Sequence, residues 1–149
     1  AIVDAGGDVA LIGTRPPVYG SENGWVVMIA HPRVARRNWC SLIVRDLAVV
    51  TSGDYERFFF HGNKRYHHIL DPATGYPASR CVSVTVIGPR AELSDALATA
   101  GFVLGYEGTL RLFSGFPGYG FMILQEKGGT LQAHFSPGFR ERYQYKESI

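Results

Sequence analysis

Glycine and proline interrupt this 149-residue chain at short intervals. The chain contains 18 Gly and 8 Pro, residues that favour turns and interrupt regular helices. Between them lie short apolar runs, and the longest of these, such as residues 25–30 and 47–50, cannot cross a bilayer. The pattern therefore predicts many short strands and few helices, and it excludes coiled coils and helical bundles.

The composition is that of an ordered domain, with 46% hydrophobic, 13% aromatic and 19% charged residues. We expect one domain over residues 1–149, with a polar, flexible tail at 140–149. A chain of this length buries a core without disulfides or a structural metal. It begins at Ala1, without an initiator Met, inside a strand-like segment. We therefore expect a fragment or a processed piece that starts in a buried strand.

Charge and cysteine content exclude some partners. The net charge is +2, and only Arg33, Arg36 and Arg37 cluster, so a nucleic-acid partner is not expected. Cys40 and Cys81 stand in apolar, strand-like surroundings, which favours two buried thiols. A disulfide in an oxidising compartment remains the alternative. No CxxC motif or Cys/His spacing in the sequence suggests a zinc site.

The predicted fold class is α+β, a mainly antiparallel sheet with one main helix. The helix is expected at about 90–104, with Pro89 in its first turn and Gly105 after its end. A tight turn at Arg45-Asp46 is expected to join two paired strands. Strands are predicted at 2–3, 9–12, 25–29, 42–44, 47–50, 56–60, 64–69, 82–87, 121–124 and 130–135, and loops at 14–24 and 71–78.

Asp95 and Thr99 are four residues apart in the predicted helix, so they share one face. A carboxylate and a hydroxyl presented together are hard oxygen ligands suited to Mg²⁺. The alternative is that Asp95 interacts with the helix N-terminus and Thr99 only packs.

The second candidate is the pair His67-His68, which strand alternation sends to opposite faces. A His at a strand end beside a Pro/Gly loop is placed for general-base chemistry near neutral pH. The alternative is an ordinary surface hairpin with two solvent-facing histidines.

The third candidate is the segment 51–57, which follows an apolar strand. The amides and hydroxyls of Ser52 and Gly53 could hold a phosphate or a flavin edge, although the same pattern is typical of a turn. Ser52 lacks the surroundings of a nucleophile elbow. The glycine-rich segment 115–120 is not a dinucleotide fingerprint, because Pro117 interrupts it.

Taken in order, four segments resemble the ApbE family of FAD:protein FMN transferases: VDAGGD (3–8), TSGDYERFF (51–59), RYHHILDPATGYPA (65–78) and SDALATAGFVLG (94–105). The resemblance implies a T-fold-like domain and covers most of residues 1–105. It corresponds to the C-terminal portion of the family fold. No counterpart of the family's N-terminal half, with its GAxxKG-like segment, occurs here. A missing N-terminal segment or a second chain would complete the site.

The resemblance also implies the chemistry: FMN passes from FAD to a Ser or Thr of a redox-complex subunit, with Mg²⁺ as cofactor and AMP as product. Asp95 and Thr99 would bind Mg²⁺, and His68 would be the base and a flavin contact with Ile69. The FAD cleft would also be lined by Gly6, Gly7, Asp8, Ser52 and Gly53. The alternatives are an FAD pyrophosphatase that gives FMN and AMP, or a non-catalytic flavin-binding fragment.

The resemblance further implies a periplasmic or membrane-anchored lipoprotein, held to the membrane only through a lipidated N-terminal Cys. Neither Cys40 nor Cys81 stands at such a position. Extracytoplasmic placement is therefore expected from the resemblance alone, with a cytoplasmic location as the alternative.

Overall fold

The computed structural model describes residues 1–14 and 24–148. Most of the loop expected at 14–24 thus lies outside the described residues. The elements are β1 (Ile2–Asp4), β2 (Val9–Leu11), β3 (Trp25–Ala30), β4 (Asn38–Val44), β5 (Ala48–Gly53), β6 (Phe58–His61), β7 (Lys64–His67), β8 (Ser83–Gly88), α1 (Ala91–Phe113), β9 (Gly120–Lys127), β10 (Thr130–Phe135), α2 (Phe139–Arg142) and β11 (Lys146–Glu147).

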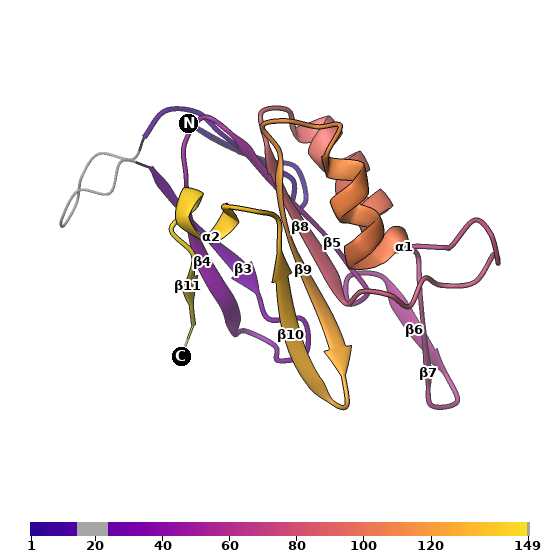
Figure 1. Cartoon of the computed structure of the whole chain (residues 1–149). Coiled ribbons are helices and arrows are strands. Elements are labelled where there is room, and N and C mark those ends of the chain that lie inside the picture. The colour runs from indigo at the N-terminus through magenta and orange to yellow at the C-terminus, as the bar shows by residue number, and fades with distance from the viewer. Residues whose placement is uncertain (15–23, 149) are drawn as a thin grey trace.

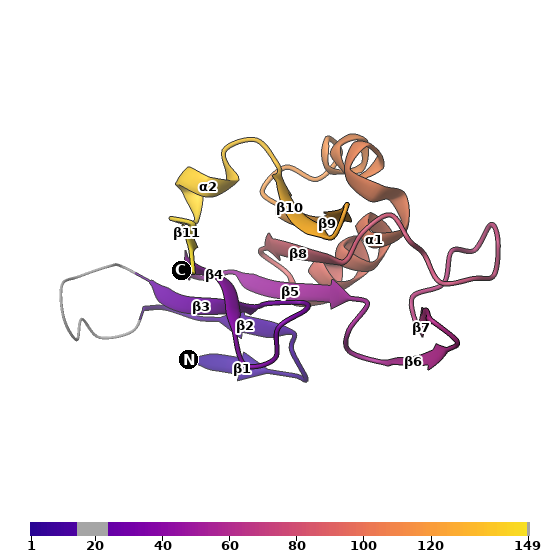
Figure 2. The ribbon, with the colours of Figure 1, turned by 90° about the horizontal axis from the view of Figure 1, so that it is seen from below.

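The strands form three antiparallel sheets. Six strands make the main sheet, in the order β1-β2-β5-β8-β9-β10, and a second sheet has the order β11-β4-β3. The hairpin β6–β7 is paired only with itself and projects beyond the main sheet (Figures 1 and 2). Every strand pair in the described residues is antiparallel, so the predicted α+β class is confirmed.

Each face of the main sheet has its own apolar core, because alternate residues of a strand point to opposite faces. Val84 and Val86 of β8 pack under α1 together with Phe102. Ile87 of β8 and Met122 of β9 face the other way, toward β3, β4 and α2. Helix α1 and the small sheet therefore cover opposite faces of the six strands (Figure 1).

Helix α1 runs past its predicted end, with a sharp break at Gly105. That residue has φ 73° and ψ −179°, a conformation open almost only to glycine. Beyond the break, the Thr109 hydroxyl lies within hydrogen-bond distance of the carbonyl oxygens of Gly105 (2.7 Å) and Gly101 (3.1 Å), to which it donates across the break. Gly105 thus ends the expected helix, and a second helical segment, residues 106–113, follows. Pro89 precedes the N-cap residue, Arg90, and is not in the first turn.

The strands on either side of Arg45-Asp46 do not pair with each other. β4 lies between β3 and β11, and β5 lies between β2 and β8, in different sheets. The expected hairpin is therefore wrong, because both edges of each strand are already occupied. Asp46 has φ 53° and turns the chain from one sheet to the other.

The two ends of the chain also differ from expectation. The residues at 140–148 are not a flexible tail, because Tyr143 is only 2% exposed. Its carbonyl oxygen accepts a hydrogen bond of 2.9 Å from the N–H of Ile43, and β11 pairs with β4. At the other end, β1 is an exposed edge strand and not a buried one.

Cys40 and Cys81 are free, buried thiols in different cores, so the predicted thiols are confirmed and the disulfide alternative is wrong. Burial raises the pKa of each to about 12. Within the described residues, no helix has both the length and the apolar character that crossing a membrane requires.

We expect Gly105→Ala to lower the free energy of unfolding by about 1–3 kcal/mol. An alanine would have to keep a backbone conformation reserved for glycine, with its Cβ 3.2 Å from Cβ and Cδ of Arg80. Urea unfolding followed by circular dichroism measures the loss. Gly115→Ala is the matched control, since its added Cβ meets only the Leu112 carbonyl oxygen, at 3.6 Å. Equal losses in the two variants would contradict this account of the break.

Candidate functional site

The first segment of α1 presents Asp95 and Thr99 on its exposed side, one turn apart. The Thr99 hydroxyl lies 3.2 Å from the Ser52 hydroxyl of β5, so helix and sheet meet at these two side chains. The first-turn acid of the helix is Glu92, which accepts a hydrogen bond of 2.7 Å from Arg90. Asp95 lies beyond this first turn, and interaction with the helix dipole falls off after the first turn.

Asp8 approaches the same place from the turn between β1 and β2. Burial raises the pKa of Asp8, and the negative charges of Asp95 and then Asp4 raise it further. The carboxylates of Asp8 and Asp95 therefore lie within electrostatic reach of each other. We call Asp8, Ser52, Asp95 and Thr99 the oxygen cluster.

The donor set of the oxygen cluster fits a small divalent cation. Two carboxylates repel each other unless positive charge lies between them, and hydroxyls complete a hard oxygen set. In the described residues, no group of three or more His, Cys, Asp and Glu side chains could hold a metal by itself.

Gly6 and Gly7 stand beside Asp8 with φ angles of 76° and 106°. A Cβ added at either residue would meet no heavy atom within 4 Å, so this backbone faces open space. Both residues border a cavity of about 280 Å³ between the β1–β2 turn, β3 and β5, whose other lining residues include Val27, Thr51 and Tyr55. The cavity joins apolar side chains to accessible backbone groups.

Gly53 has a structural reason to be glycine, because a Cβ there would lie 2.5 Å from the ring of Tyr55. The ring packs against the bare backbone, and burial raises the pKa of Tyr55 to about 12. Ser52, by contrast, directs its hydroxyl to Thr99. Gly53 thus serves packing, whereas its neighbour Ser52 belongs to the oxygen cluster.

His67 and His68 take opposite faces, as predicted. His67 is buried, and its Nε2 donates to the Ala78 carbonyl oxygen (2.9 Å) while its Nδ1 accepts from the Ile69 N–H (3.3 Å). His68 is exposed, with Nδ1 3.3 Å from the Arg57 carbonyl oxygen. A proton on Nδ1 leaves Nε2 of His68 as the basic nitrogen.

Ile69 is only 5% exposed and belongs to the core under α1. Its N–H donates to His67, and its carbonyl oxygen accepts from the Ala78 N–H at 3.0 Å. A flavin contact by Ile69 would thus be a van der Waals contact. Within residues 1–14 and 24–148, no hydrogen bond or ion pair joins His68 or Ile69 to the oxygen cluster.

A charged network was not foreseen from the sequence. Arg33 donates two hydrogen bonds to Asp54 (2.7 and 2.8 Å) and a third to Glu126 (3.0 Å), and Arg65 adds a contact of 3.1 Å to Asp54. The Asp54 carboxylate is 11% exposed and borders a cavity of about 220 Å³. An acidic residue straight after a buried strand was the available signal, since such a group needs a partner.

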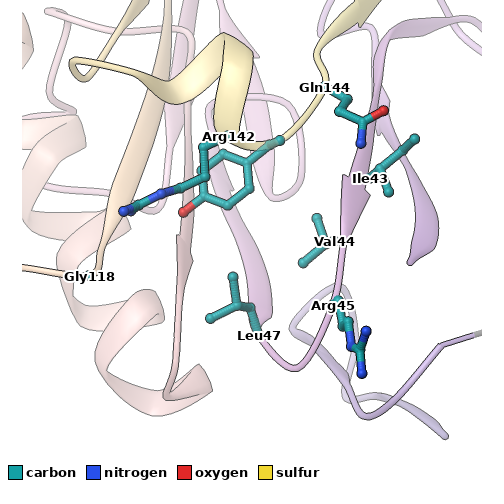
Figure 3. Close-up of a pocket in the computed structure, with 8 residues that line it drawn as sticks. Ile43, Val44, Arg45, Leu47, Gly118, Arg142 and Gln144 are labelled. Carbon is teal, nitrogen blue, oxygen red and sulfur yellow. The ribbon is translucent and has the colours of Figure 1, made fainter. Parts of the chain in front are cut away.

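Another cavity, of about 380 Å³, lies where α2 returns to β4 and contains none of the predicted site residues. Figure 3 shows Arg142 and Arg45 on opposite sides of Val44 and Leu47. Because the two guanidinium groups do not converge, this cavity has no arrangement suited to an anion.

Comparison with known proteins connects this geometry to a family. The chain is 45% identical over 127 residues to the FAD:protein FMN transferase of Treponema pallidum (strain Nichols), covering 79% of the chain and 34% of that protein. It is 38% identical over 110 residues to the FAD:protein FMN transferase of Vibrio cholerae, covering 71% of the chain and 31% of that protein. The chain thus spans about a third of the length of these curated relatives.

Solved structures agree. The ApbE protein of Thermotoga maritima matches with a TM-score of 0.77 and 37% identity, over 95% of the chain and 44% of that structure. The flavin transferase ApbE from Vibrio cholerae matches with a TM-score of 0.72 and 28% identity, over 94% of the chain and 43% of that structure. The model of the ApbE family matches residues 1–123. The chain therefore belongs to the ApbE family.

Proposed function

We propose that this chain carries the metal-binding and proton-accepting side chains of an FAD:protein FMN transferase. The observation that carries the proposal is the contact of 3.2 Å between the Thr99 and Ser52 hydroxyls, with the exposed Asp95 carboxylate one turn away on the same helix; Asp8 lies within electrostatic reach of Asp95. Asp8, Asp95 and Thr99 would hold Mg²⁺, with Ser52 positioning Thr99. When bound, Mg²⁺ supplies positive charge to the pyrophosphate oxygens of FAD.

The reaction transfers a phosphoryl-linked flavin between oxygens. The hydroxyl oxygen of an acceptor Ser or Thr attacks the phosphorus of the FMN half of FAD, and the P–O bond to the AMP half breaks. Nε2 of His68 accepts the hydroxyl proton, since Nδ1 is directed to Arg57. His67 is unsuited to this role, because it is buried and both of its nitrogens are engaged.

The cavity beside Gly6 and Gly7 is suited to part of the FAD molecule. Val27 and Val49 offer apolar contact, and the bare glycine backbone allows a planar or charged group to approach closely. Gly53 would contribute through its backbone, and Ile69 by a van der Waals contact. The acceptor would be a subunit of a redox complex outside the cytoplasmic membrane, as the family resemblance implies.

Product analysis separates transfer from its alternatives. The chain is incubated with FAD, Mg²⁺ and a Thr-containing acceptor protein, followed by intact-mass spectrometry and chromatography. Transfer predicts an acceptor heavier by FMN minus water, with AMP but no free FMN. AMP with equal free FMN would show hydrolysis. FAD binding with neither product would show a non-catalytic flavin-binding fragment.

We expect Asp95→Ala to reduce Mg²⁺-dependent release of AMP by about 100-fold or more. The fold should remain, because the Asp95 side chain is exposed and faces away from the core. Chromatography measures AMP, and circular dichroism measures folding. Glu107→Ala removes another exposed acid from the same helix and should retain activity. Unfolding of the Asp95 variant would instead favour a structural role.

We expect His68→Ala to slow transfer by about 10²–10⁴-fold, the usual contribution of a general base. FAD binding, followed by flavin fluorescence, should be largely intact, since the main proposed role of His68 is toward the acceptor hydroxyl. His134→Gln alters a histidine whose ring instead packs against Tyr106 at 4.9 Å, and it should transfer normally. A His68 variant with the wild-type rate would remove His68 as the base.

Because the pKa of Asp8 is raised, we expect the stability of the fold to depend on pH. The folded state binds the proton of this carboxyl more tightly than the unfolded state, so ionised Asp8 destabilises the fold as pH rises above its ordinary value of 3.8. Asp8→Asn should therefore raise the melting temperature at pH 7 without metal. This gain in melting temperature should vanish at about pH 3, where Asp8 is protonated in both the folded and the unfolded state.

Added Mg²⁺ should raise the melting temperature of the wild-type chain more than that of the Asp8→Asn variant. Wild-type chain gains melting temperature because the cation relieves the repulsion between Asp8 and Asp95, whereas the Asn variant gains less. Thermal unfolding with and without MgCl₂ measures both effects. An equal gain in the two proteins would remove Asp8 from the metal site.

A further inference from the structure

The β6–β7 hairpin exposes aromatic side chains beside positive charge. Phe59 and Phe60 are 63% and 59% exposed, and nearby Tyr76 is 61% exposed. Residues 57–70 include three Lys or Arg side chains and no Asp or Glu, with Glu56 and Asp71 standing just outside the two ends of this stretch. Apolar exposure of this kind on a projecting element marks a surface for binding (Figure 2).

Strand register places a set of these side chains on one face. Phe59 lies opposite Tyr66, and their rings stack at 5.4 Å with an interplanar angle of 11°. Lys64, His68 and Leu70 follow the same alternation, because each is an even number of residues from Tyr66. Exposure agrees, since His68 and Leu70 are exposed whereas His67 and Ile69 are buried. We call Phe59, Lys64, Tyr66, His68 and Leu70 the docking face.

The positive charge of the docking face is held in place. The ammonium group of Lys64 lies 5.3 Å from the centre of the Tyr66 ring and 5.8 Å from that of Tyr76. Lys64 forms no ion pair among the described residues, where Arg65 instead contacts Asp54. A cation fixed over aromatic rings and without an acidic partner favours a negatively charged ligand.

On the opposite face, where Phe58 and Phe60 remain exposed, Arg65 and His67 attach the hairpin to the body of the protein. Arg65 lies 4.4 Å from the ring of Phe58 and 5.4 Å from that of Phe60, and it reaches the carboxylate of Asp54 at 3.1 Å. His67 adds the hydrogen bond to Ala78. A face presented on a fixed support loses less conformational entropy on binding than a mobile loop does.

The occupant follows from charge and position. A second copy of the chain, joined hairpin to hairpin about a twofold axis, would bring Arg57 and Lys64 of both copies together, and like charges repel. An acidic polypeptide meets no such repulsion. The docking face also contains His68, so a polypeptide bound there brings its hydroxyls to that side chain.

We propose that the docking face binds the acceptor polypeptide and selects segments in which the hydroxyl residue is flanked by acidic and apolar residues. The proposal rests on the proposed function for the role of His68. Phe59, Tyr66 and Leu70 supply apolar contact area, and Lys64 supplies the charge that distinguishes acidic from basic segments.

Two fluorescein-labelled 20-residue peptides test the proposal. Each contains one Thr among Leu and Val residues, flanked in one peptide by four Glu and in the other by four Lys. Fluorescence anisotropy is measured with the full chain and without FAD or Mg²⁺. We expect the Glu peptide to bind about tenfold more tightly than the Lys peptide, and Phe59→Ser to weaken its binding about tenfold. Lys64→Glu should reverse the preference.

Val26→Ser is the matched control, because Val26 is 56% exposed on the distant strand β3, and it should bind the Glu peptide as wild type does. Equal affinity for the two peptides, or equal loss in the Phe59 and Val26 variants, would overturn the proposal. Phe59-dependent sedimentation with vesicles of phosphatidylcholine and phosphatidylglycerol, without peptide binding, would assign the face to a membrane instead. Since binding is measured without FAD, a failure of FMN transfer leaves this result independent.

Discussion

The site depends on the close approach of helix α1 to strands β5 and β8. Small residues make that approach feasible: Ala98 is fully buried, and a Cβ on Gly101 would already lie 3.4 Å from the Val84 side chain. At this separation the short hydroxyl side chains of Thr99 and Ser52 reach each other. A larger residue at the contact would lift the helix and separate the oxygen cluster, so packing and chemistry share one constraint.

Local periodicity allowed much of this to be predicted. The four-residue spacing of Asp95 and Thr99 put them on one helix face, and alternation separated His67 from His68. Long-range pairing is different, because no local pattern states which strand takes which edge. For that reason the turn at Arg45-Asp46 suggested a hairpin that does not form. The polar composition of residues 140–149 likewise concealed the single buried aromatic side chain, Tyr143, that anchors this segment.

The proximity of Asp8 to Asp95 also could not be obtained from periodicity, since they come from segments far apart in the chain; only the family resemblance placed them in one cleft. The charged network around Asp54 escaped prediction for the same reason. In that network, ion pairs attach one element to the rest of the fold, as backbone pairing between strands does elsewhere. The β6–β7 hairpin makes no backbone ladder with either larger sheet, and Arg65 secures it through a largely buried carboxylate. Removing Asp54 would leave Arg65 without an ion pair among the described residues and Arg33 with Glu126 alone.

The exposed edge hairpin β1–β2 gives the oxygen cluster one wall that is weakly held. β2 pairs with β5 through Val9 with Val49 and Ala10 with Ala48, and the Leu11 N–H adds a hydrogen bond of 3.0 Å to the Leu47 carbonyl oxygen, whereas β1 is exposed along its whole length. Asp8 belongs to this hairpin, whereas Asp95 stands on a helix packed against the core. Local opening of an edge hairpin requires far less free energy than unfolding of the whole domain. A ligand that bridged Asp8 and Asp95 would therefore also hold this hairpin in its paired position, and any open fraction of the hairpin would lower the apparent affinity. Contacts that stabilise β1 in its paired position would thus raise the affinity for such a ligand without touching it.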